Sequence, residues 1–510
     1  MLWIALHLPL LSLESFAATL PSAPGARPLA LMDAHAILHV NAAARALGVR
    51  PGFKRATALA LAPQLTFGQA DRERDAQALA AVAHAALAFT PGVSIQPPSA
   101  ATPDDTPHTV LLEVQASLRY FGGLAALRQR LQDALEPLGH RVHIVSARTA
   151  LGAALLARVH ARLDCADLGS TCAALDRVPV WLLGPGRAHW EALQGMGLRT
   201  IADLRGMPRD GLARRFGEVV LDELDRASGT RPDPREPLAL PASFDSRLEL
   251  FARADTAEQL MHGAAALLAR LVAWLSAQHA FARRFTLRME HEQRSRRDGP
   301  GAVTALDIAL AEPSRDPAHL RVLLRERLAQ LQLPAPTLEL RLQATDIARR
   351  APPNAELFPT PASEHEGLTR LIERLQARLG REQVLRLVPR HDHRPERATA
   401  WRSADAALRP GRARGAADSA AVAFHAMRPV WLLQHAEPLH ERDSTPLVDG
   451  QALQLLSGPE RIESGWWDAE LVARDYFIAQ LPGGALVWIY RARVPAVATG
   501  PSWFLQGRFG

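Results

Sequence analysis

Apolar and polar residues follow two kinds of pattern in the first third of the chain. The uncharged apolar run at residues 2–8 and the apolar stretch from Thr109 to Val114 favour buried strands. Leucines recur at helical spacing from Leu124 to Leu135, which predicts an amphipathic helix. Strands and helices mixed in this way predict an α+β domain. The pattern also predicts a helical region at about 30–63, a helix at 71–89, a strand from Arg141 to Ser146 and a helix from Leu151 to Leu163.

A second group of strands and helices follows a proline-rich stretch, Arg231 to Pro237, which we interpret as a linker. Apolar residues alternate with polar ones in four segments, and two longer segments with helical spacing lie between them. This order predicts two strand-helix-strand units that form one four-stranded sheet. The expected strands are Ser243 to Phe251, Ala282 to Glu290, Val303 to Ala309 and Thr337 to Ala344, and the expected helices lie at about 256–278 and 317–330.

The pattern is less regular beyond residue 345. Residues 402–422 are rich in Ala, Arg and Gly, which predicts a flexible linker. Short alternating segments with tight turns follow it and predict a β-rich module. Tryptophan is dense in this module, and we expect most of these side chains to fill its core. The residues are Trp431, Trp466, Trp467, Trp488 and Trp503.

Composition adds limits to this picture. A chain of 510 residues that is 48% hydrophobic is long enough for three or four domains. The net charge of +6 suits a polyanionic partner, although Lys54 is the only lysine and an excess of arginine is also typical of a GC-rich genome. Cys165 and Cys172 give a poor zinc signature, so a reduced cytoplasm is the expected setting. No basic residue precedes Arg27 and no later apolar stretch is long enough to span a membrane, so we expect neither a signal peptide nor a membrane partner.

The first fifteen residues resemble the first metal-binding motif of the Y-family (translesion) DNA polymerases. In that family a buried strand that runs into a helix carries two aspartates, in a segment that reads roughly Val-Asp-Met-Asp-Ala-Phe-Phe-Ala-Ser-Val-Glu. Alignment of its last three residues with Ser12-Leu13-Glu14 puts Ala5 and His7 at the aspartate positions. Mg²⁺ requires oxygen ligands such as carboxylates, and alanine supplies none.

A second segment, Val110 to Gly123, resembles the second metal motif of the same family, Asp-Glu-Ala-Phe-Leu-Asp-Val-Thr. The alignment puts His108 and Thr109 at its Asp-Glu pair. Two-metal phosphoryl transfer needs those carboxylates to hold the ions, so the resemblance implies a polymerase fold without catalytic residues, metal or cofactor. An active polymerase with displaced metal ligands stays open as an alternative, and its candidate carboxylates are Asp33, Asp104 and Asp105.

Further motifs extend the resemblance over nearly the full length of the chain. Arg45 remains at a nucleotide-contacting position of the family's fingers, whereas Ala42 replaces a tyrosine and Ala150 replaces a phosphate-binding lysine. The whole pattern, which includes His393-Arg-Pro-Glu-Arg397, is similar to the ImuB family, the Y-family-like members of the bacterial mutasome. The resemblance implies a palm with fingers at 1–168 (fingers about 25–70), a helical thumb at 169–236, a little finger at 240–346, a linker at 347–378 and a C-terminal partner-recruitment region at 379–510 that contains the flexible stretch 402–422.

Two regions are candidates for DNA contact. A Gly-x-Gly turn between short helices lets backbone N–H groups approach a phosphate, although such turns are also common as plain connectors. Three arginines on or beside one expected strand of the little finger can neutralise phosphates, and the alternative is a solvated basic loop. The candidates are Gly184, Gly186, Arg187, Gly195 and Gly197 in the thumb, and Arg283, Arg284 and Arg288 in the little finger.

A short segment in the expected linker resembles the bacterial sliding-clamp motif Gln-x-x-Leu-Phe. Asn354-Ala-Glu-Leu-Phe358 has asparagine at the polar lead position. Leu357 and Phe358 would fill an apolar pocket on the clamp, and Asn354, one methylene shorter than glutamine, would reach a polar notch less well. This position is where ImuB proteins carry their clamp motif.

The resemblance implies a non-catalytic translesion-synthesis scaffold that acts in DNA-damage-induced mutagenesis. Its implied partners are primer-template DNA, the sliding clamp (beta subunit), an error-prone C-family DNA polymerase and the RecA-like accessory protein ImuA. Besides the active polymerase considered above, the sequence leaves open a stand-alone DNA-binding module with no replication partner. Clamp binding would discriminate between that module and the scaffold.

Overall fold

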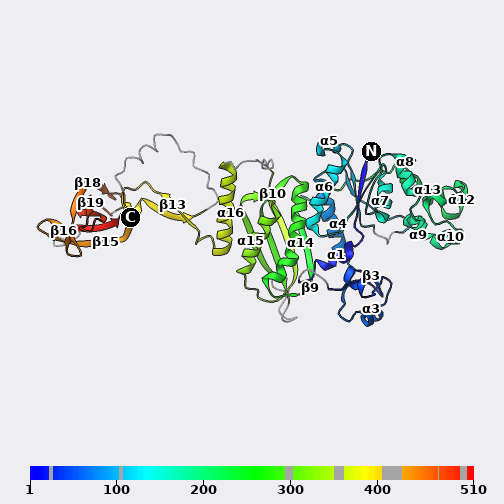
Figure 1. Ribbon diagram of the computed structural model, residues 1–510, viewed down its shortest axis with the longest axis horizontal. Coiled ribbons are helices and arrows are strands. Elements are labelled where there is room, and N and C mark those ends of the chain that lie inside the picture. Colours follow the sequence, from blue (N-terminus) through cyan, green and yellow to red (C-terminus); the bar gives the residue numbers. More distant parts are fainter. Residues whose placement is uncertain are drawn as a thin grey trace. The chain divides into compact units, whose positions relative to one another are not determined.

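The computed structural model describes residues 1–21, 27–102, 107–292, 303–349, 361–404, 428–468, 470–493 and 502–509. The chain forms two compact units, Met1–Phe358 and Pro359–Gly510 (Figure 1). Strands and helices are mixed in the first unit, and the second unit is mainly β-structure. The predicted α+β fold class with a β-rich C-terminal module is therefore confirmed.

The first unit contains a five-stranded sheet in the order β5-β6-β1-β7-β8. Strand β1 (Trp3–His7) is central and pairs antiparallel with β6 (Thr109–Glu113) and β7 (His143–Ala147). Because successive side chains point to opposite faces, Ile4 and Leu6 join the core on one face and Ala5 joins the core on the other. The edge strands are β5 (Val93–Ile95) and β8 (Arg162–Asp164), the first face packs on α4 (Arg72–Leu87) and α6 (Leu124–Leu135), and the second packs on α7 (Ala150–Val159).

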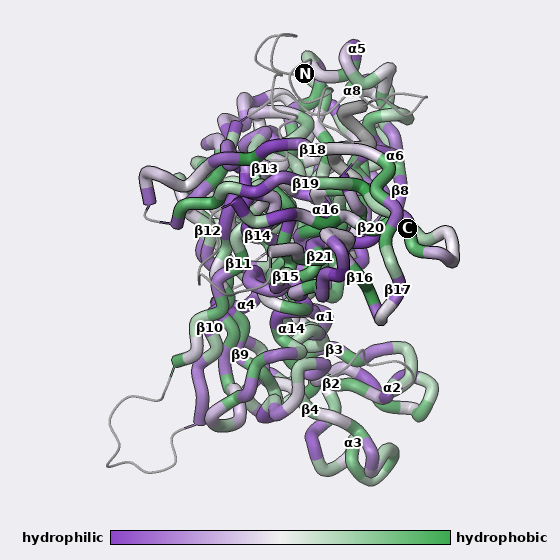
Figure 2. The backbone as a smooth tube through the Cα atoms, turned by 90° about the vertical axis from the view of Figure 1, so that its left-hand side faces the viewer, coloured by the Kyte–Doolittle hydropathy of each residue, from purple (hydrophilic) through white to green (hydrophobic). Residues whose placement is uncertain are grey.

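The helical prediction for 30–63 is wrong for Leu29–Asp33 and Ala36–Val40, which are strands; helices form only at Ala42–Ala46 and Arg55–Leu61. The region belongs to a small lobe of three strands and two short helices. Its apolar residues are buried in a core that includes Ala30, Ile37 and Val40. Tertiary packing of an alternating pattern outweighs the helix propensity of alanine here. Figure 2 shows the lobe as a group of elements at one end of the view. Its elements are β2 (Leu29–Asp33), β3 (Ala36–Val40), α2 (Ala42–Ala46), α3 (Arg55–Leu61) and β4 (Thr66–Gln69).

Short helices follow the five-stranded sheet and share the core beneath α7. Two of them begin with a capping box, in which the side chain of the N-cap residue accepts a hydrogen bond from the backbone N–H three residues later. The side chain of that later residue accepts one from the N-cap backbone N–H in return. The pairs are Asp167 with Ser170, and Thr200 with Asp203. The elements are α8 (Leu168–Leu175), η2 (Val180–Leu182), α9 (Gly184–Ala188), α10 (Trp190–Gly195), α11 (Ile201–Arg205), α12 (Arg209–Phe216) and α13 (Glu218–Ser228).

A four-stranded antiparallel sheet in the order β11-β10-β12-β9 completes the first unit. All four strands were predicted, and each is longer than expected. One face packs on α14 (Ala257–Ala277) and α15 (Pro317–Ala329), and α14 also packs on α4 of the first sheet. The other face is exposed. The strands are β9 (Phe244–Ala254), β10 (Ala280–His291), β11 (Val303–Ser314) and β12 (Thr337–Arg349).

Helix α14 is long and apolar enough by composition to cross a membrane, and among the described residues it is the single helix that meets this criterion. In its most apolar window, 61% of the residues are buried inside the protein. Trp274 on this helix is fully buried, and its indole N–H donates to the carbonyl of Pro241 at 3.1 Å. The packing is that of a core helix, which accounts for its apolar composition.

The second unit begins with α16 (Pro361–Leu379) and a two-stranded hairpin, and continues into a seven-stranded sheet. Apolar cores lie on both faces of this sheet. Residues 402 and 403 of the predicted linker end strand β14, and residues 405–422 of it lie outside the described residues. The hairpin is β13 (Leu385–Pro389) and β14 (Thr399–Ser403), and the sheet is β17 (Gln451–Ala452), β16 (Thr445–Val448), β15 (Trp431–Arg442), β21 (Trp503–Arg508), β20 (Leu486–Ala492), β19 (Val472–Gln480) and β18 (Gln454–Ser464).

The prediction that most tryptophans of the C-terminal module fill its core is wrong. Trp488 and Trp503 are buried, whereas Trp431, Trp466 and Trp467 are 70%, 77% and 54% exposed. The exposed ones lie at the start of β15 and in the turn between β18 and β19, where neighbouring strands do not cover them. Exposed aromatic side chains of this kind are typical of protein interfaces.

Candidate functional site

Ala5 and His7, which the resemblance places at the first metal motif, lie on the central strand β1. Ala5 is fully buried and sits between Leu111 of β6 and Val145 of β7. His7 sits two residues further on the same face, opposite Thr109 and His143. The four predicted positions are therefore together, because Thr109 pairs with His7 and His108 directly precedes it.

Thr109 and His7 are in direct contact. The Thr109 hydroxyl and His7 Nδ1 are 2.9 Å apart, and Thr109 is fully buried. The ring of His143 lies 5.9 Å from the ring of His7, between centroids, and His143 Nδ1 is 2.9 Å from the carbonyl oxygen of Ala157. His143 is not among the residues predicted from the sequence. The sequence signal for His143 was its position in the alternating segment at residues 141–146. The strand order was needed to show that His143 lies beside His7.

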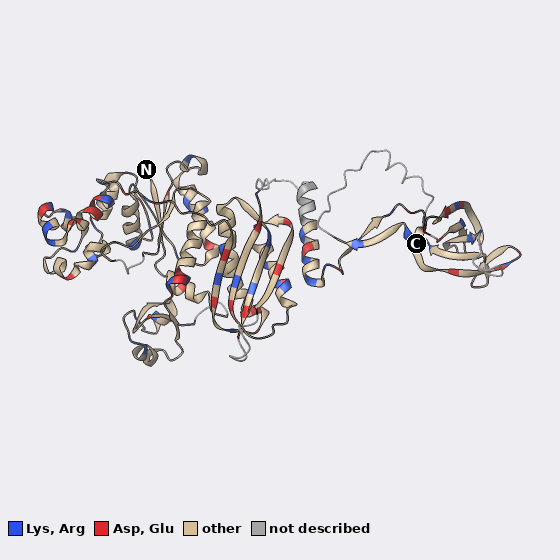
Figure 3. Cartoon of the chain, turned by 180° about the vertical axis from the view of Figure 1, so that it is seen from behind, with Lys and Arg blue, Asp and Glu red and all other residues tan. Residues whose placement is uncertain are grey.

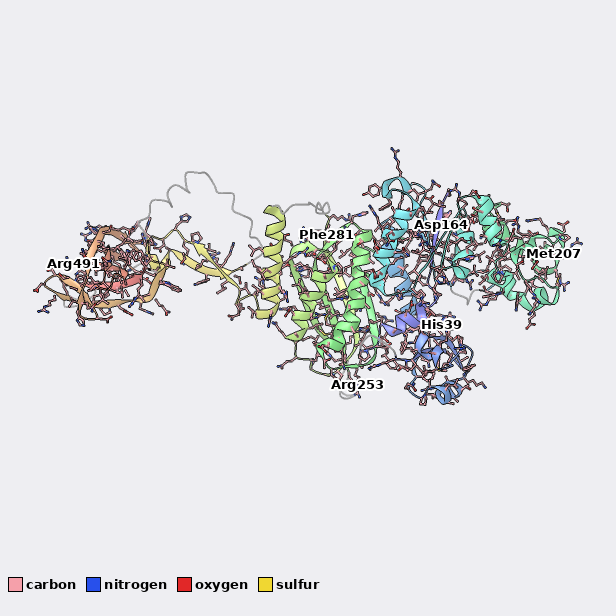
Figure 4. All side chains as sticks on the ribbon, in the orientation of Figure 1. His39, Asp164, Met207, Arg253, Phe281 and Arg491 are labelled. Carbon is pink, nitrogen blue, oxygen red and sulfur yellow. The ribbon has the colours of Figure 1, made fainter. Side chains whose placement is uncertain are left out.

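The groups around His7 give this part of the protein a neutral or positive charge. Burial, together with the neighbouring Arg158, His143 and His108, lowers the pKa of His7 to about 3. His39 lies on the small lobe (Figure 4), and burial followed by the charge of His108 lowers its pKa as well. A neutral imidazole beside an arginine is a poor environment for Mg²⁺, which prefers carboxylate oxygens.

Candidate metal ligands elsewhere do not form a site in the described part of the chain. In that part, no group of three or more His, Cys, Asp or Glu side chains is arranged to hold a metal ion. Asp33 is exposed at the end of β2, and Asp104 and Asp105 lie outside the described residues. Asp164 (Figure 4) accepts hydrogen bonds from Ser146 and Arg128.

The buried histidines predict a loss of stability in mild acid. Burial lowers the pKa of His84 to about 4 and that of His7 to about 3, so both stay neutral in the folded chain at pH 5. An unfolded histidine with a pKa near 6.5 gains a proton, so the unfolded state binds more protons and stability falls as pH drops below 6.5. At pH 5 the loss is roughly 2 kcal/mol for each residue, because one pKa unit corresponds to about 1.4 kcal/mol.

Urea unfolding at pH 8 and pH 5 measures this loss. His84→Leu should reduce the difference in unfolding free energy between the two pH values by roughly 2 kcal/mol, because leucine does not titrate. Equal pH dependence in the two proteins would contradict the prediction.

The first glycine pair of the candidate thumb site packs inside the protein. A Cβ added to Gly184 would meet the Ser99 hydroxyl at 1.9 Å, and one added to Gly186 would meet the carbonyl oxygen of Val180 at the same distance. The Gly184 N–H already donates to Glu223 Oε2 at 3.2 Å. Close internal packing therefore explains these two glycines without a phosphate.

The second glycine pair is open to solvent. Gly195 ends α10, and Gly197 follows it with φ of +78°, a left-handed conformation that glycine adopts without strain. Both are exposed, as is Arg187 on α9, and a Cβ at either glycine would meet no atom within 4 Å. Phosphate contact at this turn stays a prediction.

The three candidate arginines Arg283, Arg284 and Arg288 lie on β10 of the four-stranded sheet with their side chains exposed. Arg284 and Arg288 belong to the exposed face of the four-stranded sheet, and Arg283 lies at an irregularity in the register next to it. The strand pairing puts Arg288 beside Arg341 of β12, and Arg341 beside Arg247 of β9. An arginine row therefore crosses three strands, and Arg341 and Arg247 were not recognised from the sequence.

Acidic residues flank the arginine row on both sides. Glu290, Glu339 and Glu249 form a row across the same three strands, two residues away along each strand. Arg341 pairs with Asp245 at 2.6 Å, and Arg247 pairs with Glu73 of α4. In Figure 3 the strands of this sheet carry both red and blue bands. The face contains the arginines Arg247, Arg284, Arg288 and Arg341 and the acids Asp245, Glu249, Glu290, Asp307, Glu339 and Asp346.

The remaining candidate residues lie apart from these sites. Asn354, Leu357 and Phe358 of the clamp-motif candidate are outside the described residues. Arg45 is exposed in the last turn of α2, and Ala150 is buried at the start of α7.

Comparisons with known proteins give one full-length relative from two strains. The chain is 30% identical to ImuB of Caulobacter vibrioides strains NA1000 / CB15N and ATCC 19089 / CIP 103742 / CB 15 over 478 residues, which cover 91% of this chain and 100% of the relative. No family model matches. Among solved structures, the chain is similar to an insertion ternary complex of Dbh DNA polymerase, with a TM-score of 0.38 and 16% identity over 69% of this chain and 100% of that chain. It is also similar to DinB from Sulfolobus solfataricus, with a TM-score of 0.36 and 16% identity over 68% of this chain and 99% of that chain. Because the identity to the relative extends over its full length, the chain belongs to the ImuB family.

Proposed function

We propose that this chain is a non-catalytic, polymerase-like scaffold of DNA-damage-induced mutagenesis. It binds primer-template DNA and the sliding clamp (beta subunit), and it recruits an error-prone C-family polymerase and the RecA-like protein ImuA. The observation that carries the proposal is the 30% identity to ImuB over the full length of that relative. The sequence alignment that puts Ala5, His7 and Thr109 at the positions of the metal-binding acids supports it, and these residues are neighbours on β1 and β6. In this proposal the five-stranded sheet is the palm, the small lobe the fingers, the short helices the thumb and the four-stranded sheet the little finger.

The chemistry of the β1 cluster supports a non-catalytic role. Phosphoryl transfer between nucleotides relies on metal ions to stabilise charge on the reacting oxygens, and the protein must supply anionic ligands to hold them. Ala5 offers no ligand, and His7 is a neutral ring whose Nδ1 already contacts Thr109. The neighbouring Arg158 adds a positive charge, which opposes binding of a second positive ion.

The surface of the C-terminal module supports a recruitment role. Arg394, whose side chain is 2% exposed, pairs with Asp392 at 2.7 Å and with Asp468 at 2.6 Å. Asp468 lies in the turn between β18 and β19, so this ion network fixes that turn against the β13–β14 hairpin. The same turn presents Trp466 and Trp467 to solvent, with their rings 5.3 Å apart between centroids. A rigid loop that displays two aromatic side chains loses little entropy when a partner binds.

The purified full chain is expected to bind a fluorescent primer-template duplex with salt-dependent affinity and to add no nucleotide in Mg²⁺ or Mn²⁺. A catalytic Y-family polymerase on the same duplex serves as the positive control for extension. Extension by this chain that disappears in an Asp104→Ala/Asp105→Ala variant would instead identify an active polymerase with displaced metal ligands. Absence of any DNA binding would overturn the DNA-scaffold part of the proposal.

A further inference from the structure

Residues 34–70, which make up most of the small lobe, contain no aspartate or glutamate. The same stretch carries Arg45, Arg50, Lys54 and Arg55, and all four side chains are exposed. This stretch therefore has a net positive charge that no acid within it offsets, and Asp33 at the end of β2 is the one acid in residues 29–69. Lys54, the single lysine of the chain, is one of these four residues.

The contacts of these cations leave their charges unneutralised. The Arg50 guanidinium donates to the backbone carbonyl of Arg45 at 2.8 Å, which holds it near the end of α2. The Arg55 guanidinium lies 5.1 Å from the centre of the Phe67 ring. Among the described residues, none of the four side chains forms an ion pair with a carboxylate.

The exposed face of the four-stranded sheet differs from the lobe because its arginines have acidic neighbours. Its four arginines are interleaved with six carboxylates, and Arg341 and Arg247 are already in ion pairs. A phosphate that approaches the arginine row therefore competes with internal acids. Residues 29–69 of the small lobe carry four cations and one acid, Asp33, and among the described residues none of the four cations is in an ion pair.

We propose that the small lobe binds the sugar-phosphate backbone of a nucleic-acid strand through Arg50, Lys54 and Arg55. The proposal rests on DNA being a ligand of this chain, and it assigns the salt-dependent part of that binding to the lobe and not to the sheet face. Guanidinium groups match phosphate oxygens in bidentate geometry, and several spaced cations match a ligand with regularly spaced charges. Arg45 is not included in the proposed site because the family resemblance implies that it contacts a nucleotide.

The test compares two triple variants of the full chain. One is Arg50→Gln/Lys54→Gln/Arg55→Gln in the lobe, and the matched control is Arg283→Gln/Arg284→Gln/Arg288→Gln in the sheet. The Kd for a fluorescent primer-template duplex is measured from 50 to 300 mM salt, and the slope of log K against log salt is compared. Each lost phosphate contact lowers the slope by about one, so the lobe variant should lose two to three units of slope and bind roughly 10- to 100-fold more weakly at the lowest salt.

Each outcome has a defined meaning. A variant with lysine at positions 50 and 55 should retain the slope, because it keeps the charges, and thermal unfolding checks that all variants are folded. An unchanged slope in the lobe variant, or an equal loss in the sheet variant, would overturn the inference while leaving DNA binding by the chain intact. If the wild-type chain binds no duplex, the proposed function fails with it. Loss of binding to polyglutamate but not to DNA would identify an acidic protein as the ligand of the lobe and reject the inference.

Discussion

A chain that ends at Leu379 is expected to bind primer-template DNA and the clamp like the full chain but to lose all detectable capture of the error-prone polymerase and of the RecA-like protein. The reason is that residues 380–510 contain the hairpin, the seven-stranded sheet and its exposed tryptophans. The cut follows α16, because a cut near residue 400 would pass through β14 and break the pairing with β13. Pull-down of purified partners with immobilised chain measures the loss.

A second variant separates loss of contact from loss of structure. Trp466→Ser/Trp467→Ser in the full chain removes two exposed side chains, including the Trp467 ring whose centre lies 5.7 Å from the Arg394 guanidinium, and keeps the ion pairs of Arg394 with Asp392 and Asp468. Thermal unfolding checks that this variant is folded. If these residues anchor the partner, affinity should fall at least about 30-fold, since an interface hot spot contributes roughly 2 kcal/mol or more. Capture of both partners by the chain that ends at Leu379 would place recruitment in the rest of the molecule.

Leu357→Ala/Phe358→Ala is expected to weaken clamp binding by about two orders of magnitude or more. Two apolar anchors at an interface hot spot contribute roughly 1–3 kcal/mol each, and both are removed. DNA binding should be unchanged, because the motif lies outside the segments proposed to contact DNA. Surface plasmon resonance with immobilised clamp measures the effect.

The matched control for the clamp variant is Glu356→Ala in the same five residues. It lies between the polar lead and the anchors, so it should change the affinity little. Clamp affinity that is equal in the wild type and the double alanine variant would show that the clamp site lies elsewhere. An equal effect of Glu356→Ala would indicate a charge contact in place of an apolar pocket.

The fold could be predicted where one local pattern determined it. The four strands of the second sheet were found because apolar and polar residues alternate in each, and β1 was found because its residues are apolar throughout. The strands at Leu29–Asp33 and Ala36–Val40 were missed because alanine is abundant there and suggested a helix. Their burial in a small core decides the conformation, and single-residue propensity does not carry that information.

The candidate site was less predictable because its partners are far apart in the sequence. His7 contacts Thr109, which lies 102 positions further along the chain, and Asp75 accepts a hydrogen bond from the hydroxyl of Ser15, which lies 60 positions before it. The sequence indicated which residues stand at the degenerate metal positions through family resemblance, and the strand register then placed them together. Most of the acids beside the arginines of β10 were missed for the same reason, since all except Glu290 come from β9, β11 and β12.

The rows of arginines and acids on the exposed sheet face limit the distance over which that face attracts a charged ligand. Neighbouring rows are two residues apart along each strand, which is about 7 Å. Ions screen charges over about 8 Å at physiological salt, so rows of opposite sign cancel within one screening length of the surface. The face therefore attracts neither polyanions nor polycations from a distance, and its charges act only once a ligand is in contact. What they supply is register: a bound molecule must match the stripe of arginines with the stripe of glutamates on one side of it, which rewards one alignment and penalises a shift of one row.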